Sequence, residues 1–593
     1  MAGESESTEA DICADARQLL DGGRPAEAIS LLTAALQNRP QAQSLLAGLG
    51  EVLCRSGQFA QAAQHLEKVV AADSNNAANL FYYGVALQGL GSLKPAIIHL
   101  RRALDLQPQL TEAYRALSMA LWGVAPEHAI ATLDEARRKN AATGQTEGLC
   151  FFFRQTLADW SVFDDSINWL RTQLDAGATD LEPAICCIVP GFGPAEQRRV
   201  AEAYGRMIGG AGARPTLDAR EGDKIRIGYL SADLGEHPVG RLMAGILEHH
   251  DRNRFEVFAY STRPGGDLPT TRRLRAAAQH FVDVHHLSDA DAVARIGSDS
   301  IELLVDLSCY TEGGRPRIVA QRPAPIQINY LGMGGTTGHP AYDYILTDEV
   351  LTPPTLLAHY SETPAFLPEV YLNIDQAAAP PQRNHDRARW SLPEKGFVFC
   401  AFNNTVKITP SHFHLWMEIL QAVPDSVLWL RDYHPGARQR IAGEAERAGV
   451  NPQRIVFAPG AERAEHLMRL AHADLLLDCF PYNGGSTTAD ALWSGLPVLT
   501  QVGDTYVSRM SASMVRALDL HELAVDDREA YKSQAIRLAT QPATIADLRA
   551  RLTMRRTTSA LFDSARFTGQ LEAIFEEMAR RSRRGLPATA PIR

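Results

Sequence analysis

Several features that would each indicate a class of protein are missing from this sequence. No apolar run approaches the ~18 residues of a membrane span, and the acidic, polar N-terminus lacks the basic and apolar regions of a signal peptide. The 59 Lys and Arg residues are outnumbered by 69 Asp and Glu residues, which gives a net charge of −10. The chain therefore lacks the global positive field of a general nucleic-acid binder. Together these absences predict a cytoplasmic protein that binds neither membranes nor nucleic acid.

Motifs for common cofactors are missing as well. The 593 residues include eight scattered cysteines and no Cys-x-x-Cys pair, so zinc-site spacing is absent and we interpret the cysteines as mostly buried thiols of a reducing compartment. There is no Gly-x-x-x-x-Gly-Lys-Ser/Thr phosphate loop and no strand-borne Gly-x-Gly-x-x-Gly. This disfavours a P-loop NTPase and a nicotinamide enzyme. A nucleotide, if one binds, must be held in another way.

The chain does contain an N-terminal repeat. Gly23, Gly57 and Gly91 are 34 residues apart, and columns of small and apolar residues follow at the same spacing: Ala28, Ala62, Ala96, Leu32, Leu66 and Leu100. This period is typical of tetratricopeptide repeats, whose helix pairs bury their apolar faces only against stacked neighbours. We predict three to four repeats over residues 1–140. They form an α-solenoid that holds a protein or peptide partner, the alternative being a helical bundle with chance periodicity.

The rest of the chain changes from helical to α/β character. Residues 141–222 are predicted to be a helical transition. Strand candidates then alternate with helices in two lobes, 223–375 and 397–575, joined by a Pro-rich linker at 376–396 and followed by a flexible basic tail at 576–593. Such alternation predicts parallel sheets covered by helices. Two lobes of this kind form a cleft at the carboxyl ends of their strands, where nucleotide-type ligands usually bind.

The strongest chemical motif is DCFPYNGGSTTADALWSGLPVL, residues 478–499. It leaves a strand, passes through glycines and enters a helical pattern, so backbone N–H groups and the positive helix end converge on a site that suits a phosphate. Ser486, Thr487 and Thr488 add hydroxyl donors, and Asp490 could accept a hydrogen bond from a ribose. The alternative is a capped helix after a tight turn.

Three other segments carry candidate residues. Lys407 follows the first strand of the second lobe and could neutralise the charge of a leaving diphosphate without a metal. His237 follows the first strand of the first lobe and could orient a sugar or transfer a proton. His466 and Arg469 share a helical face and could contact a base. The alternatives are a solvated lysine, a structural histidine and a surface helix.

Together these segments resemble the O-GlcNAc transferase and SPINDLY family of protein glycosyltransferases, glycosyltransferase family 41. The specific matches include DLGEHP, QRPAPIQINYLGMGGTTG, FNNTVKI and ADLLLDCFPYNGG, in that order behind 34-residue repeats. The resemblance covers the repeats and nearly all of residues 224–575. It implies an α + α/β chain in which the solenoid precedes a GT-B module of two Rossmann-like lobes. It also implies an inverting reaction with no metal and no cofactor beyond the nucleotide-sugar co-substrate.

The resemblance also implies roles for single residues. His237 and Lys407 match the active-site histidine and the lysine that stabilises the departing diphosphate. The nucleotide-sugar-binding positions that match are Asn404, Ala461, His466, Arg469, Ser486, Thr487 and Asp490, with Thr311 and Gly332 in the sugar pocket. The proton acceptor stays open between His237, a donor phosphate oxygen and, more weakly, Asp306.

Some positions depart from the family pattern and widen the choice of donor. Gly485 replaces a histidine before the helix, Val406 replaces an aromatic neighbour of the lysine, and FPYNGGSTT is partway toward the SPINDLY branch. We expect UDP-GlcNAc as donor and a protein Ser or Thr as acceptor. GDP-fucose, UDP-glucose or a CMP-nonulosonic acid, as in flagellin glycosylation, are the alternatives. A non-catalytic repeat scaffold is the alternative of a different class.

Overall fold

A computed structural model describes residues 8–216, 223–375 and 386–593 of the chain. Residues 376–385, which make up the first part of the expected linker, lie outside the described residues, as do the last residues of the expected helical transition. Within the described ranges, none of the helices is both long enough and apolar enough to span a membrane.

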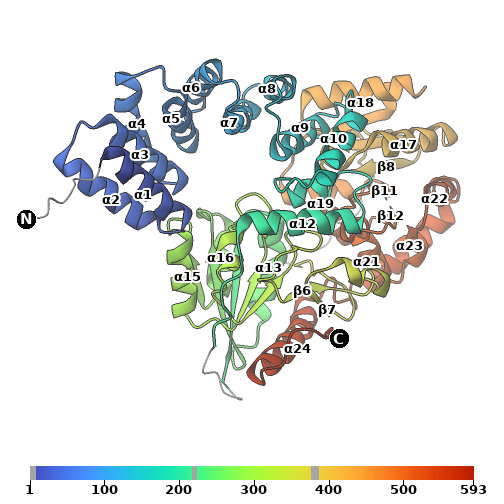
Figure 1. Cartoon of the computed structure of the whole chain (residues 1–593). Helices are drawn as coiled ribbons and strands as arrows, with labels where there is room; N and C mark the ends of the chain where they lie inside the picture. Colours follow the sequence, from blue (N-terminus) through green and yellow to red (C-terminus); the bar gives the residue numbers. More distant parts are fainter. Residues whose placement is uncertain (1–7, 217–222, 376–385) are drawn as a thin grey trace, which may run out of the picture. The chain divides into compact units, whose positions relative to one another are not determined.

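The described chain divides into two compact units, whose elements are labelled in Figure 1. The first unit comprises Met1–Phe153 and His286–Arg295, and the second comprises Arg154–His285 and Ile296–Arg593.

The first unit is a succession of helices in which each packs against the next in the chain. These are α1 (Glu9–Asp21), α2 (Pro25–Asn38), α3 (Gln43–Arg55), α4 (Phe59–Ala72), α5 (Ala77–Gly89), α6 (Leu93–Leu106), α7 (Thr111–Trp122) and α8 (Pro126–Arg138). The alanine and leucine columns of the 34-residue period are all fully buried. Gly23, Gly57 and Gly91 have φ of 76°, 75° and 73°, a left-handed conformation that glycine adopts without strain. The period therefore specifies both the core and the turns of this unit.

Close approach between paired helices explains a second glycine column. A Cβ added to Gly84 in α5 would lie 2.6 Å from Cγ of Leu100 in α6, and one added to Gly50 in α3 would lie 2.4 Å from Cγ of Leu66 in α4. Both distances are far below van der Waals contact. The absence of a side chain is thus what lets these helices pack against the leucine column.

Further helices connect the repeats to the lobes. They are α9 (Gly144–Thr156), α10 (Phe163–Asp175), α11 (Pro183–Cys186) and α12 (Pro194–Ile208). Residues 141–216 are therefore largely helical where the structure describes them.

The first lobe contains a seven-stranded parallel sheet in the order β3-β2-β1-β4-β5-β6-β7. Its strands are β1 (Ile225–Ser231), β2 (Phe255–Ser261), β3 (His280–Asp283), β4 (Leu303–Asp306), β5 (Ile326–Asn329), β6 (Tyr344–Thr347) and β7 (Thr363–Phe366). The helices along this part of the chain are α13 (Pro238–His249), α14 (Pro269–Ala277), α15 (Asp289–Ser298) and α16 (Pro316–Ala320). Strand β7 has no counterpart among the predicted strands, because four residues that include a proline give little periodic signal.

The second lobe contains a six-stranded parallel sheet in the order β10-β9-β8-β11-β12-β13. Its strands are β8 (Val398–Ala401), β9 (Val427–Arg431), β10 (Ile455–Ala458), β11 (Leu475–Leu477), β12 (Val498–Gln501) and β13 (Ala524–Val525). Its helices are α17 (Pro410–Ala422), α18 (Pro435–Arg447), α19 (Arg463–Leu470), α20 (Ser486–Trp493), α21 (Met510–Arg516), α22 (Arg528–Thr540), α23 (Pro542–Arg555) and α24 (Ser564–Arg583). Short 3-10 helices are η1 (Pro354–His359), η2 (Ala388–Trp390), η3 (Thr405–Lys407), η4 (Pro452–Arg454), η5 (Tyr506–Ser508) and η6 (His521–Leu523).

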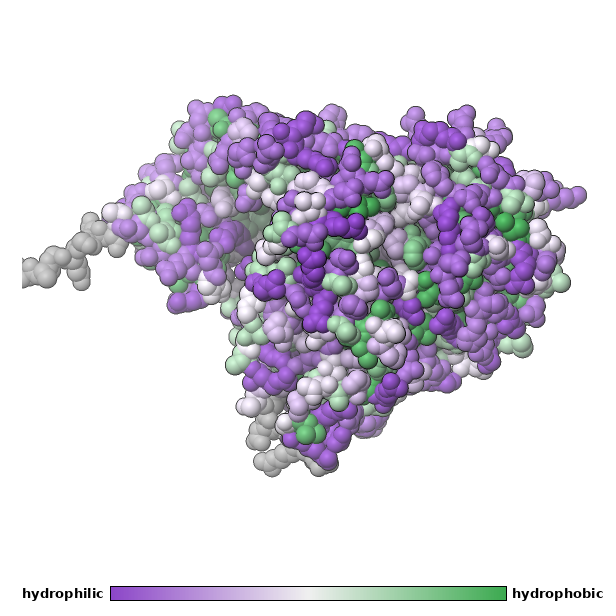
Figure 2. All heavy atoms as spheres, turned by 45° about the vertical axis from the view of Figure 1, so that its right-hand side comes forward, coloured by the Kyte–Doolittle hydropathy of each residue, from purple (hydrophilic) through white to green (hydrophobic). Residues whose placement is uncertain are grey.

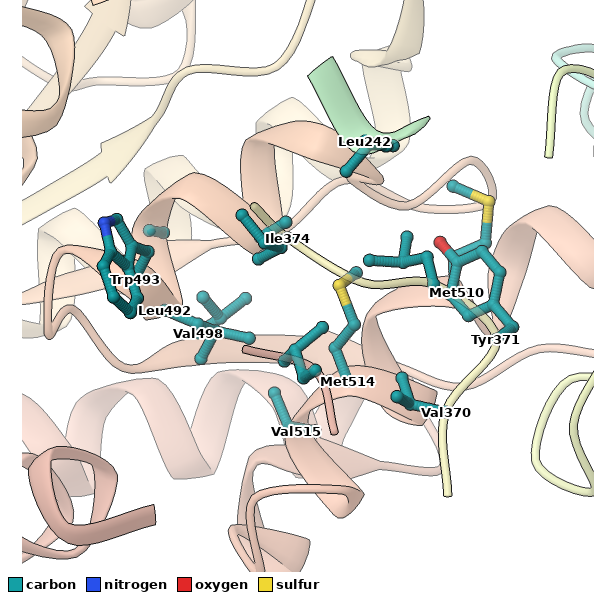
Figure 3. Packing of buried hydrophobic residues seen from close by; sticks show 14 of the residues in the cluster. Leu242, Val370, Tyr371, Ile374, Leu492, Trp493, Val498, Met510, Met514 and Val515 are labelled. Atoms are coloured by element: carbon teal, nitrogen blue, oxygen red, sulfur yellow. The ribbon is translucent and has the colours of Figure 1, made fainter. Parts of the chain in front are cut away.

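The two lobes share one apolar core. Figure 3 shows Leu242 of α13 and Ile374, near the end of the first lobe, close to the side chains of Trp493 in α20 and of Met510 and Met514 in α21. On the face seen in Figure 2, hydrophilic side chains cover most of the surface and apolar ones form small patches. The eight cysteines are free and buried, which confirms their interpretation as buried thiols.

Helix α24 fastens the end of the chain to the first lobe. The buried Glu572 carboxylate is 3.0 Å from Nδ1 of His250 and accepts a hydrogen bond of 2.6 Å from Arg254. Farther along, Arg583 pairs with Glu302 at 2.7 Å and Ile592 is only 2% exposed. Residues 576–593 were expected to be a flexible basic tail, but residues 576–583 continue α24 and Arg583 is paired with the Glu302 carboxylate instead of being solvated.

We expect Gly84→Ala to destabilise the repeat unit relative to a Gly123→Ala control. Gly123 ends α7 with a helical φ of −76° and its nearest Cβ contact would be 3.9 Å, so alanine fits there. At Gly84 the methyl group overlaps Leu100, and overpacking of this kind costs about 1–3 kcal/mol. Thermal unfolding followed by circular dichroism measures the difference. Equal melting of the two variants would show that Leu100 moves aside without cost.

Candidate functional site

A cavity of about 200 Å³ lies between the two lobes, at the start of α13 and along α19 and α20. Ser486, Ala489, Asp490 and Trp493 line it from α20. Their spacing of three and four residues places them on one face of that helix. The cavity therefore runs along α20 from its first residue, where an anion is favoured by the helix dipole.

A buried carboxylate fixes the turn that leads into α20. Oδ1 of Asp478 accepts hydrogen bonds from the Gly484 N–H at 2.7 Å and from Nδ2 of Asn403 at 3.1 Å, and Oδ2 accepts one from Thr500 at 2.8 Å. Helix α20 then begins after Gly485 with no side-chain cap. Because the first N–H groups of a helix have no intrahelical partner, they remain directed toward a ligand position, as the sequence predicts.

The three hydroxyl residues at the start of α20 differ in their surroundings. Ser486 lines the cavity and Thr487 is half-buried. Thr488, in contrast, is fully buried, and its Oγ1 lies 2.7 Å from Oγ of Ser511. The structure thus contradicts the expectation that Thr488 offers a hydroxyl to a ligand, since this hydroxyl already holds α20 against α21.

Lys407 lies beside the same turn. Its Nζ donates a hydrogen bond of 2.8 Å to the carbonyl oxygen of Asn483 and sits 3.8 Å from the ring centroid of Tyr482. Burial lowers the pKa of Lys407 to about 8, against the opposing effect of the Asp478 charge. The fold therefore brings the lysine to the residues that precede α20, as expected for two parts of one phosphate site. Asn404 caps η3, with Oδ1 accepting from the Val406 N–H at 3.2 Å.

Gln155 supports the loop that contains Lys407, and the sequence did not indicate this role. This buried side chain, near the end of α9, donates from Nε2 to the Val406 carbonyl at 3.3 Å and lies 3.5 Å from that of Ile408. It thus contacts the residues on either side of Lys407. Nothing in the local pattern around Gln155 indicates this contact, because its partners are 251 and 253 residues away.

His466 and Arg469 share one face of α19, which confirms their predicted placement. Nε of Arg469 donates to Nδ1 of His466 at 3.1 Å, and another guanidinium nitrogen donates to the Pro459 carbonyl at 2.6 Å. Burial and neighbouring arginines lower the pKa of His466 to about 3, so its ring is neutral at pH 7. Arg469 thereby fixes the loop that contains the half-buried Ala461.

Asp490 reaches the cavity already paired. Its Oδ1 lies 2.9 Å from a guanidinium nitrogen of Arg463 at the start of α19. Burial raises the pKa of Asp490, and the charges of Arg463 and Arg241 oppose that rise. A ribose hydroxyl would therefore share this carboxylate with Arg463. No local pattern indicates the role of Arg463, because its partner belongs to another segment.

His237, on the first lobe, does not itself line the cavity. It is the N-cap of α13, with Nδ1 accepting from the Val239 N–H at 3.4 Å and lying 3.5 Å from Oδ2 of Asp233. Its side chain is 48% exposed, and the next residue, Pro238, lines the cavity. Burial lowers the pKa of His237 more than the Asp233 charge raises it, so the ring is neutral at pH 7.

Asp306, Thr311 and Gly332 lie at the ends of β4 and β5 and do not line this cavity. Thr311 donates from Oγ1 to the Ser308 carbonyl at 2.6 Å. A Cβ on Gly332 would lie 1.9 Å from the carbonyl oxygen of Leu307, so close packing alone requires glycine there.

The structure argues against Asp306 as a proton acceptor. Its carboxylate is 2% exposed and accepts hydrogen bonds from the N–H groups of Ser308 and Cys309, both at 2.9 Å, and from the Tyr342 hydroxyl at 2.6 Å. Both oxygens are therefore committed to holding the loop after β4, and a substrate has no access to them.

Comparison with known proteins identifies the family. Residues 213–382 and 381–571 match Glycosyl transferase family 41. The chain belongs to glycosyl transferase family 41. Residues 19–78 and 49–111 also match tetratricopeptide repeats, which confirms the predicted repeat type.

The names of several relatives specify peptide glycosylation. The chain is 36% identical over 368 residues to the probable UDP-N-acetylglucosamine–peptide N-acetylglucosaminyltransferase SEC of Arabidopsis thaliana, a match that covers 60% of this chain and 38% of that protein. It is 28% identical to the UDP-N-acetylglucosamine–peptide N-acetylglucosaminyltransferase of Caenorhabditis elegans, a match that covers 63% of this chain and 42% of that protein. A SPINDLY protein of Solanum lycopersicum is 30% identical, covering 60% and 39%. The matches thus span about two fifths of the length of these relatives.

A solved structure aligns over almost the whole chain. A lysine-to-methionine mutant of the Thermobaculum terrenum O-GlcNAc transferase has a TM-score of 0.61 and 28% identity, covering 98% of this chain and 99% of that one. The expected fold class, repeats followed by a GT-B module of two Rossmann-like lobes, is confirmed.

The affinity for UDP-GlcNAc should fall about tenfold between pH 7 and pH 9. Lys407, with a pKa of about 8, is mostly protonated at pH 7 and mostly neutral at pH 9, so the attraction for the diphosphate is lost as the pH rises. Isothermal titration calorimetry at pH 7, 8 and 9 measures this. Lys407→Arg should show a much flatter profile, because a guanidinium stays charged. An equally steep fall in that variant would assign the titration to another group.

Asp490→Asn should weaken UDP binding and reduce the preference for UDP over 2′-deoxy-UDP. The amide loses the charge that accepts a ribose hydroxyl and pairs with Arg463, and a hydrogen bond to a charged group contributes about 1.5–3 kcal/mol. Competition binding with the two nucleotides measures the preference. Asp547→Asn, a change on the exposed side of α23, is the control. An unchanged preference in Asp490→Asn would show that Asp490 does not contact the ribose.

Proposed function

We propose that this protein is a protein O-glycosyltransferase that moves a sugar from a nucleotide sugar, with UDP-GlcNAc as the favoured donor, to a Ser or Thr of a protein. One observation carries the proposal. The Lys407 ammonium is held beside the turn that starts α20, next to a cavity lined by Ser486 and Asp490. A cation, a helix start and a carboxylate are the groups that a nucleoside diphosphate needs. The family and the names of the relatives support the same activity.

In the proposed reaction the acceptor hydroxyl oxygen forms a bond to the anomeric carbon of the sugar. The bond from that carbon to the diphosphate oxygen breaks, its electron pair stays with the leaving nucleoside diphosphate, and the configuration inverts. Lys407 and the first N–H groups of α20 stabilise the charge that grows on the diphosphate, which is the largest contribution in reactions of this kind.

The hydroxyl proton goes to His237 or to a phosphate oxygen of the donor. His237 precedes Pro238, which lines the cavity, and burial lowers the pKa of its ring, which favours the neutral form that a general base needs. We propose that no metal ion takes part. The Lys407 ammonium, held beside the turn that starts α20, can instead neutralise the charge that grows on the diphosphate.

The acceptor protein is proposed to bind along the repeats, since stacked helix pairs present an extended surface for peptides. The donor could also be GDP-fucose, UDP-glucose or a CMP-nonulosonic acid. A specific observation keeps these open, because Gly485 before α20 offers no side chain to the donor. A retained repeat scaffold without catalysis is the remaining alternative.

A panel of nucleotide sugars tests the proposal. We expect the wild-type protein to release nucleotide from one donor in the presence of a protein acceptor, and the panel identifies that donor. Lys407→Ala should lower kcat by at least about 10²–10³-fold, because an electrostatic contact made in the transition state is lost, and it should leave the melting temperature unchanged. Lys532→Ala, on the same lobe and paired with Glu418, should retain full activity.

Two outcomes would contradict the proposal. A kcat of Lys407→Ala equal to that of the wild type would show that the lysine takes no part in the mechanism. Binding of a nucleotide without release or transfer from any donor would favour the scaffold alternative.

A further inference from the structure

The cavity between the lobes carries an imbalance of charge. Five ionisable side chains line it: Arg241, Arg273 and Asp375 from the first lobe, and Arg463 and Asp490 from the second lobe. Three are cations and two are anions. Which cation lacks a partner decides what kind of ligand the cavity favours.

Two of the three arginines are already neutralised. Arg273 pairs with Asp375 and with Glu248, with nitrogen–oxygen distances of 3.1 Å and 2.6 Å. Arg463 pairs with Asp490 at 2.9 Å. These side chains need no ligand to balance their charge.

Arg241 is the exception. It belongs to α13, one turn beyond His237, and its backbone N–H donates to the His237 carbonyl at 3.1 Å. Its side chain is half-buried, and within the described parts of the chain no carboxylate forms an ion pair with its guanidinium. Burial lowers the pKa of Arg241 and the charge of Arg463 lowers it further, while Asp490 opposes both effects. A half-buried guanidinium without a partner is costly, and an anionic ligand in the cavity would remove that cost.

The surroundings of Arg241 favour a phosphate. The cavity that it lines also contains Ser486, the first residue of α20, so the guanidinium and the positive helix end face one space from opposite lobes. The Asp490 carboxylate forms an ion pair with Arg463, so it cannot also neutralise the full charge of Arg241. Guanidinium groups bind phosphate oxygens through paired hydrogen bonds.

We propose that Arg241 binds a phosphate of the nucleotide-sugar donor, so that the first lobe contributes directly to a donor held mainly by the second lobe. The proposal rests on the proposed function and adds a donor-binding residue to it. It also gives the donor a role in joining the lobes, because one diphosphate then contacts α13 and α20 together. A carboxylate on the sugar could satisfy the same guanidinium, and the experiment separates the two sources.

The test measures binding of uridine, UMP and UDP to the full chain by calorimetry or ligand-observed NMR. Arg241→Gln should weaken UDP about tenfold or more and leave uridine unchanged, since only the phosphates contact Arg241. Arg241→Lys keeps the charge but cannot form paired hydrogen bonds, so its affinity for UDP should lie between those of the wild type and Arg241→Gln. If the glutamine variant fails to fold, the lysine variant still tests the role of Arg241. The control is Arg272→Gln, which changes an exposed arginine of α14 that pairs with Asp267. Its affinities for uridine, UMP and UDP should equal those of the wild type.

Transfer assays then separate positioning from structural damage. Arg241→Gln should raise the KM for the donor more than it lowers kcat, at an unchanged melting temperature. UDP affinity equal to that of the wild type, or an equal loss for uridine and UDP, would overturn the role of Arg241 while leaving the proposed function intact. A loss confined to a nucleotide sugar that carries a carboxylate, such as a UDP-uronic acid, would overturn the assignment to phosphate. Absence of nucleotide binding by the wild type would overturn both proposals.

Discussion

The candidate site depends on the carboxylate of Asp478. This carboxylate is fully buried. Gly484, Asn403 and Thr500 donate hydrogen bonds to its two oxygens, and these bonds replace the water that burial removes. Its own carbonyl oxygen also accepts from the Tyr531 hydroxyl. Buried polar groups that are fully satisfied fix a unique local structure. Here that structure is the turn that starts α20 and supports Lys407, so the geometry of the whole phosphate site follows from one satisfied charge.

Burial also lowers the pKa values of cations in the candidate site. The protein as a whole carries a charge of −10, yet Lys407 and Arg469 have pKa values lowered to about 8 and about 10 because they are desolvated. A desolvated cation attracts an anion more strongly than an exposed one, since the local dielectric is lower. Local positive charge at a helix start, and not the net charge, therefore governs which ligand binds. The unpaired Arg241 extends this principle to the opposite lobe.

Contacts from the C-terminal part of the chain hold the two lobes together. Helix α24 returns to α13, and the buried Glu572 connects to His250 and Arg254. A second connection joins Ser513 of α21 to the buried Asp348 after β6. Such buried pairs fix a specific arrangement more than they stabilise the fold. They hold α13 and α20 where both can line one cavity.

How much the sequence alone determined differs from one part of the protein to another. The 34-residue columns predicted the repeats, because each repeat is a local unit whose core residues recur along the chain. The alternation of strands and helices predicted two parallel sheets, and the glycine-rich junction predicted a helix start for an anion, since these are local properties. Thr488, Asp306 and the start of the basic tail differ from their interpretations, because residue type does not reveal whether another group already pairs with a hydroxyl, a carboxylate or an arginine. Gln155, Arg463 and Arg241 were missed for the same reason. Only the tertiary structure decided which side chains are paired and which remain available, because burial and pairing arise between separate segments of the chain, 23 residues apart for Thr488 and Ser511 and 251 residues apart for Gln155 and Val406.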